Sequence, residues 1–234
     1  DSLFQGGREH CLGRNGCQAP TPSSPAVWLQ GGSFHASSVT VLGGANLRWG
    51  HLPTAAGLQI ESGRAWLTDS RVVGGRHYRL AGGAGIRNMS MDVVRLARTS
   101  LIGGAGTPPG PASTGPIDAT APLVGVESLQ PALQRGMPYT LRYTGSPRQP
   151  LAVLASATLG NPTLRNLTEQ PLWLFDDSNW TVVAALAFDA NGTADLNLRV
   201  PTDPRLIDQS IWFHGLSGLR PPMQASPPIG GVVR

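Results

Sequence analysis

The sequence contains no lysine. All 18 basic side chains are arginine and face 14 acidic ones, which gives a net charge of +4 over 234 residues. The arginines are scattered, and no run of them is dense enough to follow a phosphate backbone, so we expect no nucleic-acid partner. Long apolar runs are missing too. Because no stretch approaches the roughly 18 apolar residues of a membrane helix, we expect no membrane span.

Cysteine is scarce. Cys11 and Cys17 stand six positions apart in a polar, glycine-rich stretch. A disulfide across this short loop would indicate an oxidising, extracytoplasmic compartment, while two unrelated thiols are the alternative. Only His10 lies nearby, so four zinc ligands are not at hand. We therefore predict no metal site and no cofactor.

Glycine and proline are abundant, with 30 and 21 copies, and many of the glycines belong to a repeat. The stretch AVWLQGGSFHASSVTVLGG (26–44) aligns without a gap with GLQIESGRAWLTDSRVVGG (57–75). A third copy, GIRNMSMDVVRLARTSLIGG (85–104), needs one extra residue. The opening DSLFQGG matches the tail of a fourth copy. Repeats of about 30 residues are typical of stacked architectures in which each copy pairs with its neighbours.

Apolar side chains recur at fixed distances before each glycine pair. They are Phe4, Val41, Val72 and Leu101 two residues before it, with Phe34, Ala65 and Val94, then Ala36, Leu67 and Leu96, further upstream. The residues between them are mostly polar, and this alternation predicts strands with one buried face. We expect three short strands per copy, turned by glycines that accept positive φ, with the copies stacked in parallel.

This pattern resembles the right-handed parallel β-helix (pectate-lyase-like) repeats of secreted bacterial proteins. The resemblance covers residues 1–105 and rests on GLQIESGRAWLTDSRVVGG and the other copies of the repeat. The resemblance implies a short right-handed parallel β-helix of about three and a half coils. It does not imply one activity, because lyases, glycosidases, adhesins and passive stalks use such repeats. On this reading DSLFQGG is the last strand of a coil whose earlier strands are absent.

One column of residues is expected on the outer surface of the repeats. His35, Trp66 and Arg95 stand eight positions before the glycine pairs, between inward-facing apolar residues, and Trp28 also falls at an outward position. An exposed tryptophan beside polar side chains suits stacking on a sugar ring, so we predict a glycan-binding face here. Alternatively, the long loops (7–25, 45–56 and 76–84) cover this face, or Arg95 and Trp66 form a structural cation–π pair.

Acidic residues are too few and too dispersed to predict catalysis. Glycosidases need two facing carboxylates, and lyases that resemble these repeats use clustered acids to hold calcium. Asp1 and Asp69 share one column but are separated by an intervening copy, about 9–10 Å apart. Asp176, Asp177 and Asp189 match no EF-hand spacing. We predict no catalytic residue in this chain.

The second half of the chain changes in character. Residues 106–122 are rich in proline and glycine and are predicted to be a linker. Beyond it YTLRYTG alternates Tyr139, Leu141 and Tyr143 on one face, and VVAALAFDANGTADLNLRV reads as a hairpin around Asn191-Gly192. Five or more short antiparallel strands over 123–234 predict a β-sandwich.

The segment DANGTADLNLRVPTDPRLIDQSIWFHG is similar to a C-terminal module common in secreted bacterial proteins. Asp208 replaces the glycine usual in that module, and His214 stands near its usual glutamine or alanine. The resemblance implies a structural or surface module without chemistry of its own.

The sequence thus predicts an all-β protein with a parallel β-helix at 1–105, a linker and an antiparallel β-sandwich. We expect a non-catalytic structural or adhesive protein, secreted or at the cell surface, whose partner is a polysaccharide or cell-surface glycan. The alternative is the C-terminal part of a carbohydrate-active enzyme, a polysaccharide lyase or glycosidase, with its catalytic coils upstream.

Overall fold

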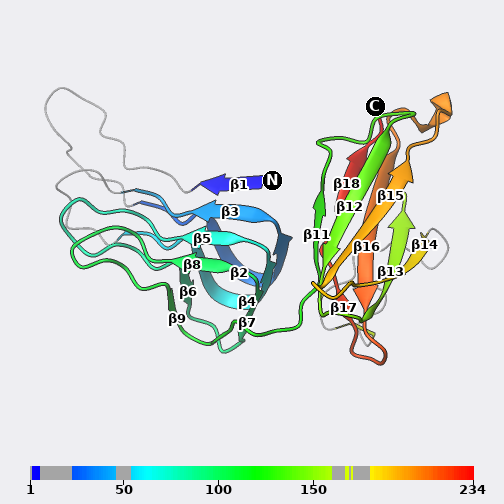
Figure 1. Cartoon of the computed structure of the whole chain (residues 1–234). Coiled ribbons are helices and arrows are strands. Elements are labelled where there is room, and N and C mark those ends of the chain that lie inside the picture. Colours follow the sequence, from blue (N-terminus) through cyan, green and yellow to red (C-terminus); the bar gives the residue numbers. More distant parts are fainter. Residues whose placement is uncertain (1, 6–22, 46–53, 160–166, 169, 171–179) are drawn as a thin grey trace, which may run out of the picture. The chain divides into compact units, whose positions relative to one another are not determined.

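The fold is described from a computed structural model, in which residues 2–5, 23–45, 54–159, 167–168, 170 and 180–234 are placed (Figure 1). The chain divides into two compact units, Asp1–Ala121 and Pro122–Arg234. Both are built from strands, so the predicted all-β class is confirmed. Among the placed residues, no helix is long and apolar enough to cross a membrane.

Two parallel sheets make up the first unit. One sheet has the order β1-β3-β5-β8, from strands Ser2–Gln5, Val39–Leu42, Arg71–Val73 and Ser100–Ile102. The other contains β2 (Val27–Ser37), β4 (Leu58–Thr68), β6 (Ile86–Asn88), β7 (Val94–Ala97), β9 (Ser113–Thr114) and β10 (Ile117–Asp118). Strands from successive repeats are therefore direct neighbours.

The pairing register is the one that the glycine alignment predicts. Val72 lies opposite Val41 on one side and Leu101 on the other, and Leu67 lies likewise between Ala36 and Leu96. These side chains point between the two sheets and form one apolar core, in which Val41, Leu58, Ile60, Leu67, Val72 and Ile86 are completely buried. Burial of this alternating apolar face is what fixes the register, since a slip by one residue would expose it.

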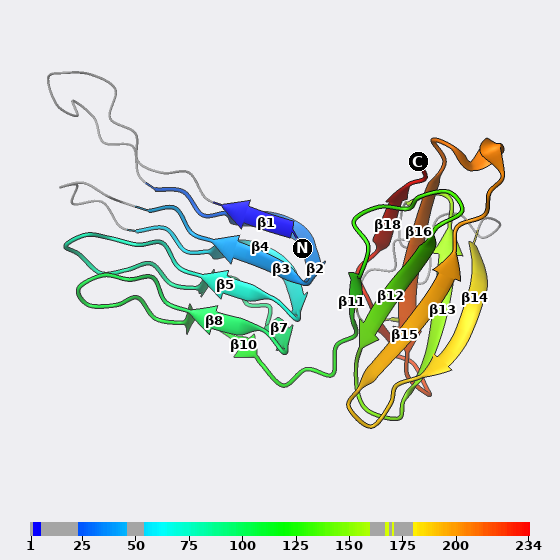
Figure 2. The same cartoon turned by 45° about the horizontal axis from the view of Figure 1, so that its top comes forward.

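The right-handed parallel β-helix expected from the sequence is not shown by the structure. The first two strands predicted in each copy are one continuous strand in β2 and in β4. Each of these strands bends at glycines of positive φ, namely Gly31, Gly32 and Gly63 (φ 115°, 72° and 101°). The bent sheet wraps around the core, and the parallel strands form a nearly closed, barrel-like layer (Figure 2). Alternation and spacing specify which strands pair, but not the path of the chain between them.

The glycine pairs also differ from their predicted role. The corner between the two sheets is turned by Ser38, Asp69 and Arg98, whose φ angles are 53°, 50° and 48°. The glycine pairs at 43–44, 74–75 and 103–104 lie beyond the strands, in the connections that we call the arms. The structure describes the arms at residues 43–45, 54–57, 74–85 and 103–112. Glycines are needed there because neighbouring arms approach so closely that a β-carbon does not fit.

Backbone contacts hold the described parts of the arms together. A β-carbon on Gly83 would lie 2.0 Å from the carbonyl oxygen of Ala55, and one on Gly104 would lie 1.9 Å from that of Gly75. The amides form a zigzag of hydrogen bonds. Gly75 donates to Ala55 (2.9 Å), Gly83 to Gly75 (2.8 Å), Gly104 to Gly83 (2.7 Å) and Gly110 to Gly104 (2.9 Å). The arms are therefore tied layer to layer through their own peptide groups.

The stretch 106–122, expected to be a linker, supplies β9 and β10 to the first unit. Ile117 packs against the apolar core, and the side-chain amide of Asn88 donates to the Pro116 carbonyl at 3.0 Å. The boundary between the units falls at Ala121 and Pro122. Proline and glycine content did not distinguish a tightly held connection from a linker.

Two antiparallel sheets make up the second unit. The first has the order β11-β12-β15 (Gly125–Ser128, Pro138–Thr144, Thr193–Arg199). The second joins β14 (Trp180–Ala187), β13 (Pro150–Ser156), β16 (Ser210–Ser217), β17 (Gln224–Ala225) and β18 (Ile229–Val232). Tyr139, Leu141 and Tyr143 of β12 are buried on one face, as predicted, in a core shared with Val153 and Phe213 of the other sheet.

The predicted hairpin around Asn191-Gly192 is wrong in its pairing. The turn forms, with Gly192 at φ 78° and the Asp189 carboxylate accepting hydrogen bonds from the amides of Asn191 and Thr193, both at 2.8 Å. However, β14 pairs with β13 whereas β15 pairs with β12, so the turn carries the chain from one sheet to the other. Two alternating strands beside a turn do not reveal whether they pair with each other or face each other.

The close approach in the arms leads to a stability prediction. Gly83→Ala places a methyl group against the Ala55 carbonyl, which only a shift of whole arms can relieve. We expect the free energy of unfolding of the first unit to fall by about 3 kcal/mol. Hydrogen exchange of peptides from 55–112, followed in increasing denaturant, measures it.

The matched control is Gly231→Ala, since a β-carbon there would have no atom within 4 Å. Because Gly231 belongs to the second unit, its effect is measured by hydrogen exchange of peptides from 209–234, and it should alter the free energy of unfolding of that unit by less than about 0.5 kcal/mol. Equal effects of the two substitutions would contradict the packing role of Gly83.

Candidate functional site

The predicted column of outward residues exists, but its central member is buried. His35 lies opposite Trp66, and Trp66 opposite Arg95, on β2, β4 and β7. The Trp66 side chain is only 4% exposed, and its ring lies 6.1 Å from that of His35 at a tilt of 59°. The expected exposed tryptophan is therefore wrong at this position. Alternation tells which side of a strand a residue occupies, but not whether that side is covered.

The same column continues onto the last strand. Asp118 of β10 lies opposite Arg95, and its carboxylate accepts hydrogen bonds from the amide and the hydroxyl of Thr120 at 2.9 and 2.8 Å. These hydrogen bonds, helped by the positive charge of Arg95, hold the pKa of Asp118 below its ordinary value. The Asp118 carboxylate is thus kept ionised beside Arg95 of the column.

Trp28 lies before the bend of β2, on a separate part of the sheet surface. It is 56% exposed and lies opposite Gln59 of β4. Gln59 lies opposite Arg87 of β6, and Arg87 opposite Thr114 of β9. Four neighbouring strands therefore present one aromatic side chain, one amide, one guanidinium group and one hydroxyl group in a row, at strand spacings of about 4.8 Å.

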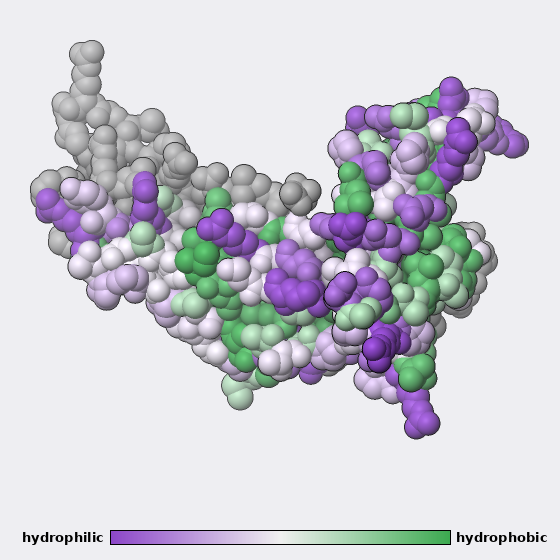
Figure 3. Space-filling model, viewed as in Figure 1, coloured by the Kyte–Doolittle hydropathy of each residue, from purple (hydrophilic) through white to green (hydrophobic). Residues whose placement is uncertain are grey.

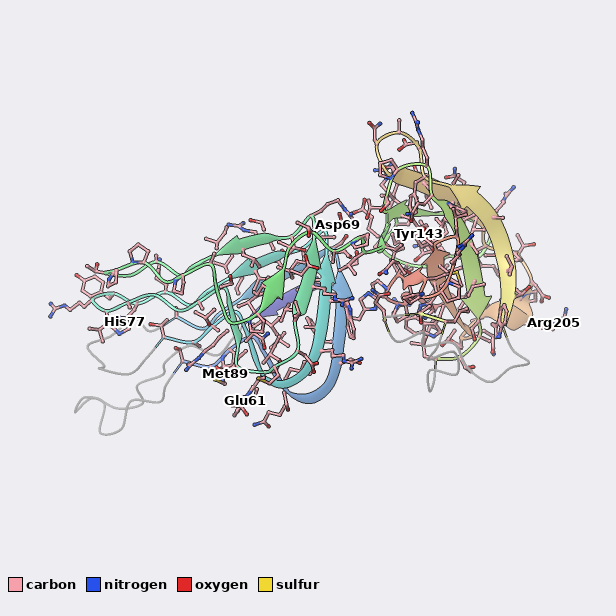
Figure 4. The ribbon with its side chains drawn as sticks, turned by 90° about the horizontal axis from the view of Figure 1, so that it is seen from below. Glu61, Asp69, His77, Met89, Tyr143 and Arg205 are labelled. Atoms are coloured by element: carbon pink, nitrogen blue, oxygen red, sulfur yellow. The ribbon has the colours of Figure 1, made fainter. Side chains whose placement is uncertain are left out.

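A second row runs beside the first and is organised by one carboxylate. Glu61 accepts a hydrogen bond from Gln30 Nε2 at 3.0 Å and a longer one from Gln59 Nε2 at 3.4 Å. Figure 4 shows Glu61 and Met89 close together at the edge of the first unit. We call the residues Trp28, Gln30, Gln59, Glu61 and Arg87 the Trp28 face.

Of the four residues predicted for glycan contact, the structure therefore groups three in one column and places Trp28 in another. Gln59 and Arg87 were not predicted, although the signal was present in the sequence. Both are the polar neighbours of buried Leu58 and Ile86, at the same outward position that drew attention to Trp28. Their polar character made them look like ordinary solvent-facing positions.

The placed carboxylates of the first unit all have partners. Asp69 accepts hydrogen bonds from Nε and Nη2 of Arg98 at 2.7 and 3.0 Å, and Asp92 lies 3.9 Å from Nε of Arg64. Glu61 and Asp118 are held as described above. Within the residues that are placed, no group of three or more His, Cys, Asp or Glu side chains could hold a metal ion. Asp1, Cys11, Cys17, Asp176 and Asp177 lie outside the described residues.

The second unit contains a buried polar cluster. His214 of β16 is completely buried, and its Nδ1 lies 3.2 Å from the carbonyl oxygen of Ser226. Gln170 lies in the same region. Its Oε1 accepts the amide of Ala225 at 2.9 Å, and its Nε2 donates to Gln224. Burial lowers the pKa of His214 to about 4, against a smaller opposing effect of the Ser226 carbonyl. The imidazole is therefore neutral in the folded protein near pH 7.

Comparisons with known proteins identify no family. No family model matches the chain, and no curated protein matches it significantly. Among solved structures, the chain is similar to the crystal structure of Spo0M, a sporulation control protein from Bacillus subtilis, at 9% identity. The match covers 48% of this chain and 49% of that one, with a TM-score of 0.25. A match this weak supports no argument about fold or function.

The resemblance to the pectate-lyase-like β-helix family is accordingly wrong. The structure has parallel sheets in a barrel-like arrangement, and no family model matches the chain. The glycine pairs on which the resemblance rested lie in the arms, where β-carbons on Gly74, Gly75, Gly103 and Gly104 would meet backbone atoms of neighbouring segments.

Burial of His214 leads to a prediction about pH. Its pKa is about 4 in the fold and near 6.5 in the unfolded chain, so the unfolded chain binds the proton first as pH falls. We expect the second unit to lose about 2 to 3 kcal/mol of stability between pH 7 and pH 4.5 from this group alone. Urea unfolding at the two pH values measures the loss.

The comparison variant is His214→Gln, which cannot titrate. It should be less stable at pH 7 but should lose less stability on acidification than the wild type. The same pH dependence in both proteins would mean that His214 is not the group responsible.

Proposed function

We propose that this chain is a non-catalytic structural or adhesive protein, secreted or displayed at the cell surface, whose first unit binds carbohydrate through the Trp28 face. The observation that carries the proposal is the exposed Trp28 in register with Gln59 and Arg87. An indole ring offers a flat apolar surface to the CH groups of a sugar ring, while amide and guanidinium groups bond its hydroxyls.

The strands that carry the Trp28 face give it a rigid backbone for binding a ligand. Gln59 and Arg87 stand beside Leu58 and Ile86, which are completely buried. Val27 and Leu29, on either side of Trp28, are partly buried and pack against the same core. Glu61 fixes the amide groups of Gln30 and Gln59. Side chains held in this way lose little entropy on binding, which favours affinity from few contacts.

A binding role rather than a hydrolytic one is supported by the carboxylates of the first unit. Hydrolysis of a glycosidic bond uses a pair of carboxyl groups on either side of it. The placed carboxylates are instead engaged in an amide bridge, two arginine contacts and a threonine turn. We further propose that the second unit is a β-sandwich that serves as a structural module. The extracytoplasmic location rests on the two cysteines and on the class of ligand.

The test is affinity electrophoresis of the full chain in gels that contain a neutral polysaccharide, namely a soluble β-glucan, xylan, galactomannan or starch. At least one of these should retard the wild type. Trp28→Ala should weaken the interaction roughly tenfold or more, because buried aromatic anchors dominate such interfaces.

The matched control is Trp180→Ala, which removes another partly exposed tryptophan, from the second unit. This variant should migrate like the wild type. The proposal fails if no neutral polysaccharide retards the chain, or if the two tryptophan variants lose binding equally.

A further inference from the structure

The far end of the arm formed by residues 74–85 has the sequence Arg76-His77-Tyr78-Arg79-Leu80. We call the exposed residues Arg76, Tyr78, Arg79 and Leu80 the arm tip. Figure 4 labels His77 at the far end of the arms, away from the sheets, and Figure 3 shows hydrophilic residues among more neutral ones at that end. The tip belongs to a different segment of the first unit from the Trp28 face.

The backbone of the arm tip is fixed rather than loose. His77 is buried, and its Nδ1 accepts hydrogen bonds from the amides of Arg79 and Leu80 at 3.0 and 2.8 Å. Two hydrogen bonds tie the tip to the next arm, from the His77 amide to Ala105 (2.8 Å) and from the Thr107 amide to Leu80 (2.9 Å). The exposed side chains therefore project from a preorganised turn.

These side chains combine an aromatic ring with guanidinium groups. Tyr78 is 70% exposed, and the guanidinium carbon of Arg79 lies 5.8 Å from the centre of its ring. Arg76 is exposed on the same turn. A guanidinium group binds carboxylate or sulfate through two parallel hydrogen bonds, and tyrosine gives a large contact area at a low entropic cost.

The arm tip lies in a stretch of the sequence that has no acidic residue. Positions 70–91 contain four arginines and no acidic residue, so this stretch alone carries a charge of +4. The whole chain has 18 basic and 14 acidic residues, and its net charge is also +4. Positions 128–168 of the second unit likewise contain four arginines and no acidic residue. The arm tip contributes two of the arginines of its own stretch, Arg76 and Arg79, and their positive charge attracts anions locally.

We propose that the arm tip binds an acidic polysaccharide, with Arg76 and Arg79 bonding its carboxylate or sulfate groups and Tyr78 packing against a sugar ring. A polymer with repeated anionic groups fits better than a lipid surface, because membrane attraction of this kind uses clusters of four to eight basic residues. The tip carries two arginines. This binding is separate from that of neutral sugars at the Trp28 face.

The experiment uses the full chain and three probes, which are polygalacturonate, dextran sulfate and uncharged dextran. Affinity electrophoresis and titration calorimetry should detect binding to at least one of the two anionic polymers, weakened by added salt, and none to dextran. Arg76→Gln/Arg79→Gln should lower the affinity roughly tenfold or more, and Tyr78→Ala should lower it severalfold.

The control is Arg220→Gln/Arg234→Gln, which removes the same charge from exposed positions of the second unit. It should change the affinity by less than about twofold, and thermal unfolding should confirm that all variants are folded. Three results would each overturn the proposal. They are equal losses in the two double variants, no binding of the wild type to either anionic polymer, and binding to phosphatidylserine vesicles in place of the polymers.

Discussion

The first unit depends on direct contact between peptide groups in its arms. The carbonyl oxygens of Ala55 and Gly75 lie where β-carbons of Gly83 and Gly104 would be. The amides of Gly75, Gly83 and Gly104 donate hydrogen bonds from one layer to the next. Loops that leave a sheet normally need side chains to bury or water to satisfy their peptide groups. Here each arm satisfies its neighbour, which lets short glycine-rich segments extend from a small core and still hold a defined shape.

The sheets and the arms of the first unit are stabilised in different ways. The apolar ladder of Val41, Val72 and Leu101 and its counterpart across the core keep the sheets in register, and the surface of the bent sheet carries the Trp28 face. The described parts of the arms are joined by backbone hydrogen bonds, and His77 fixes the turn at the tip of the arm 74–85. Both candidate surfaces thus stand on backbone whose hydrogen bonds are already made, so binding would order little.

Much of this could be predicted from alternation alone. The pairing of Ala36, Leu67 and Leu96 follows from their distance to the glycine pairs, and the buried face of β12 follows from the spacing of Tyr139, Leu141 and Tyr143. Alternation does not predict which segment covers a face of a sheet, or how the chain connects two strands. Burial of Trp66, the separation of β14 from β15 and the continuous bend of β2 depend on contacts between distant segments, which a local pattern does not encode.

The absence of lysine gains a structural meaning from the ion pairs. Arg98 with Asp69, and Arg142 with Asp195, meet through two nitrogens and two oxygens each, a geometry that an ammonium group does not offer. At Asp195 the contact holds the pKa of the carboxyl below its ordinary value. Arg142 and Asp195 link the neighbouring strands β12 and β15, whereas Arg98 and Asp69 link two neighbouring corners of the first unit. The guanidinium group, displayed on the arm tip in a stretch without acidic residues, is equipped to make the same two-bond contact with a carboxylate or sulfate from outside the protein.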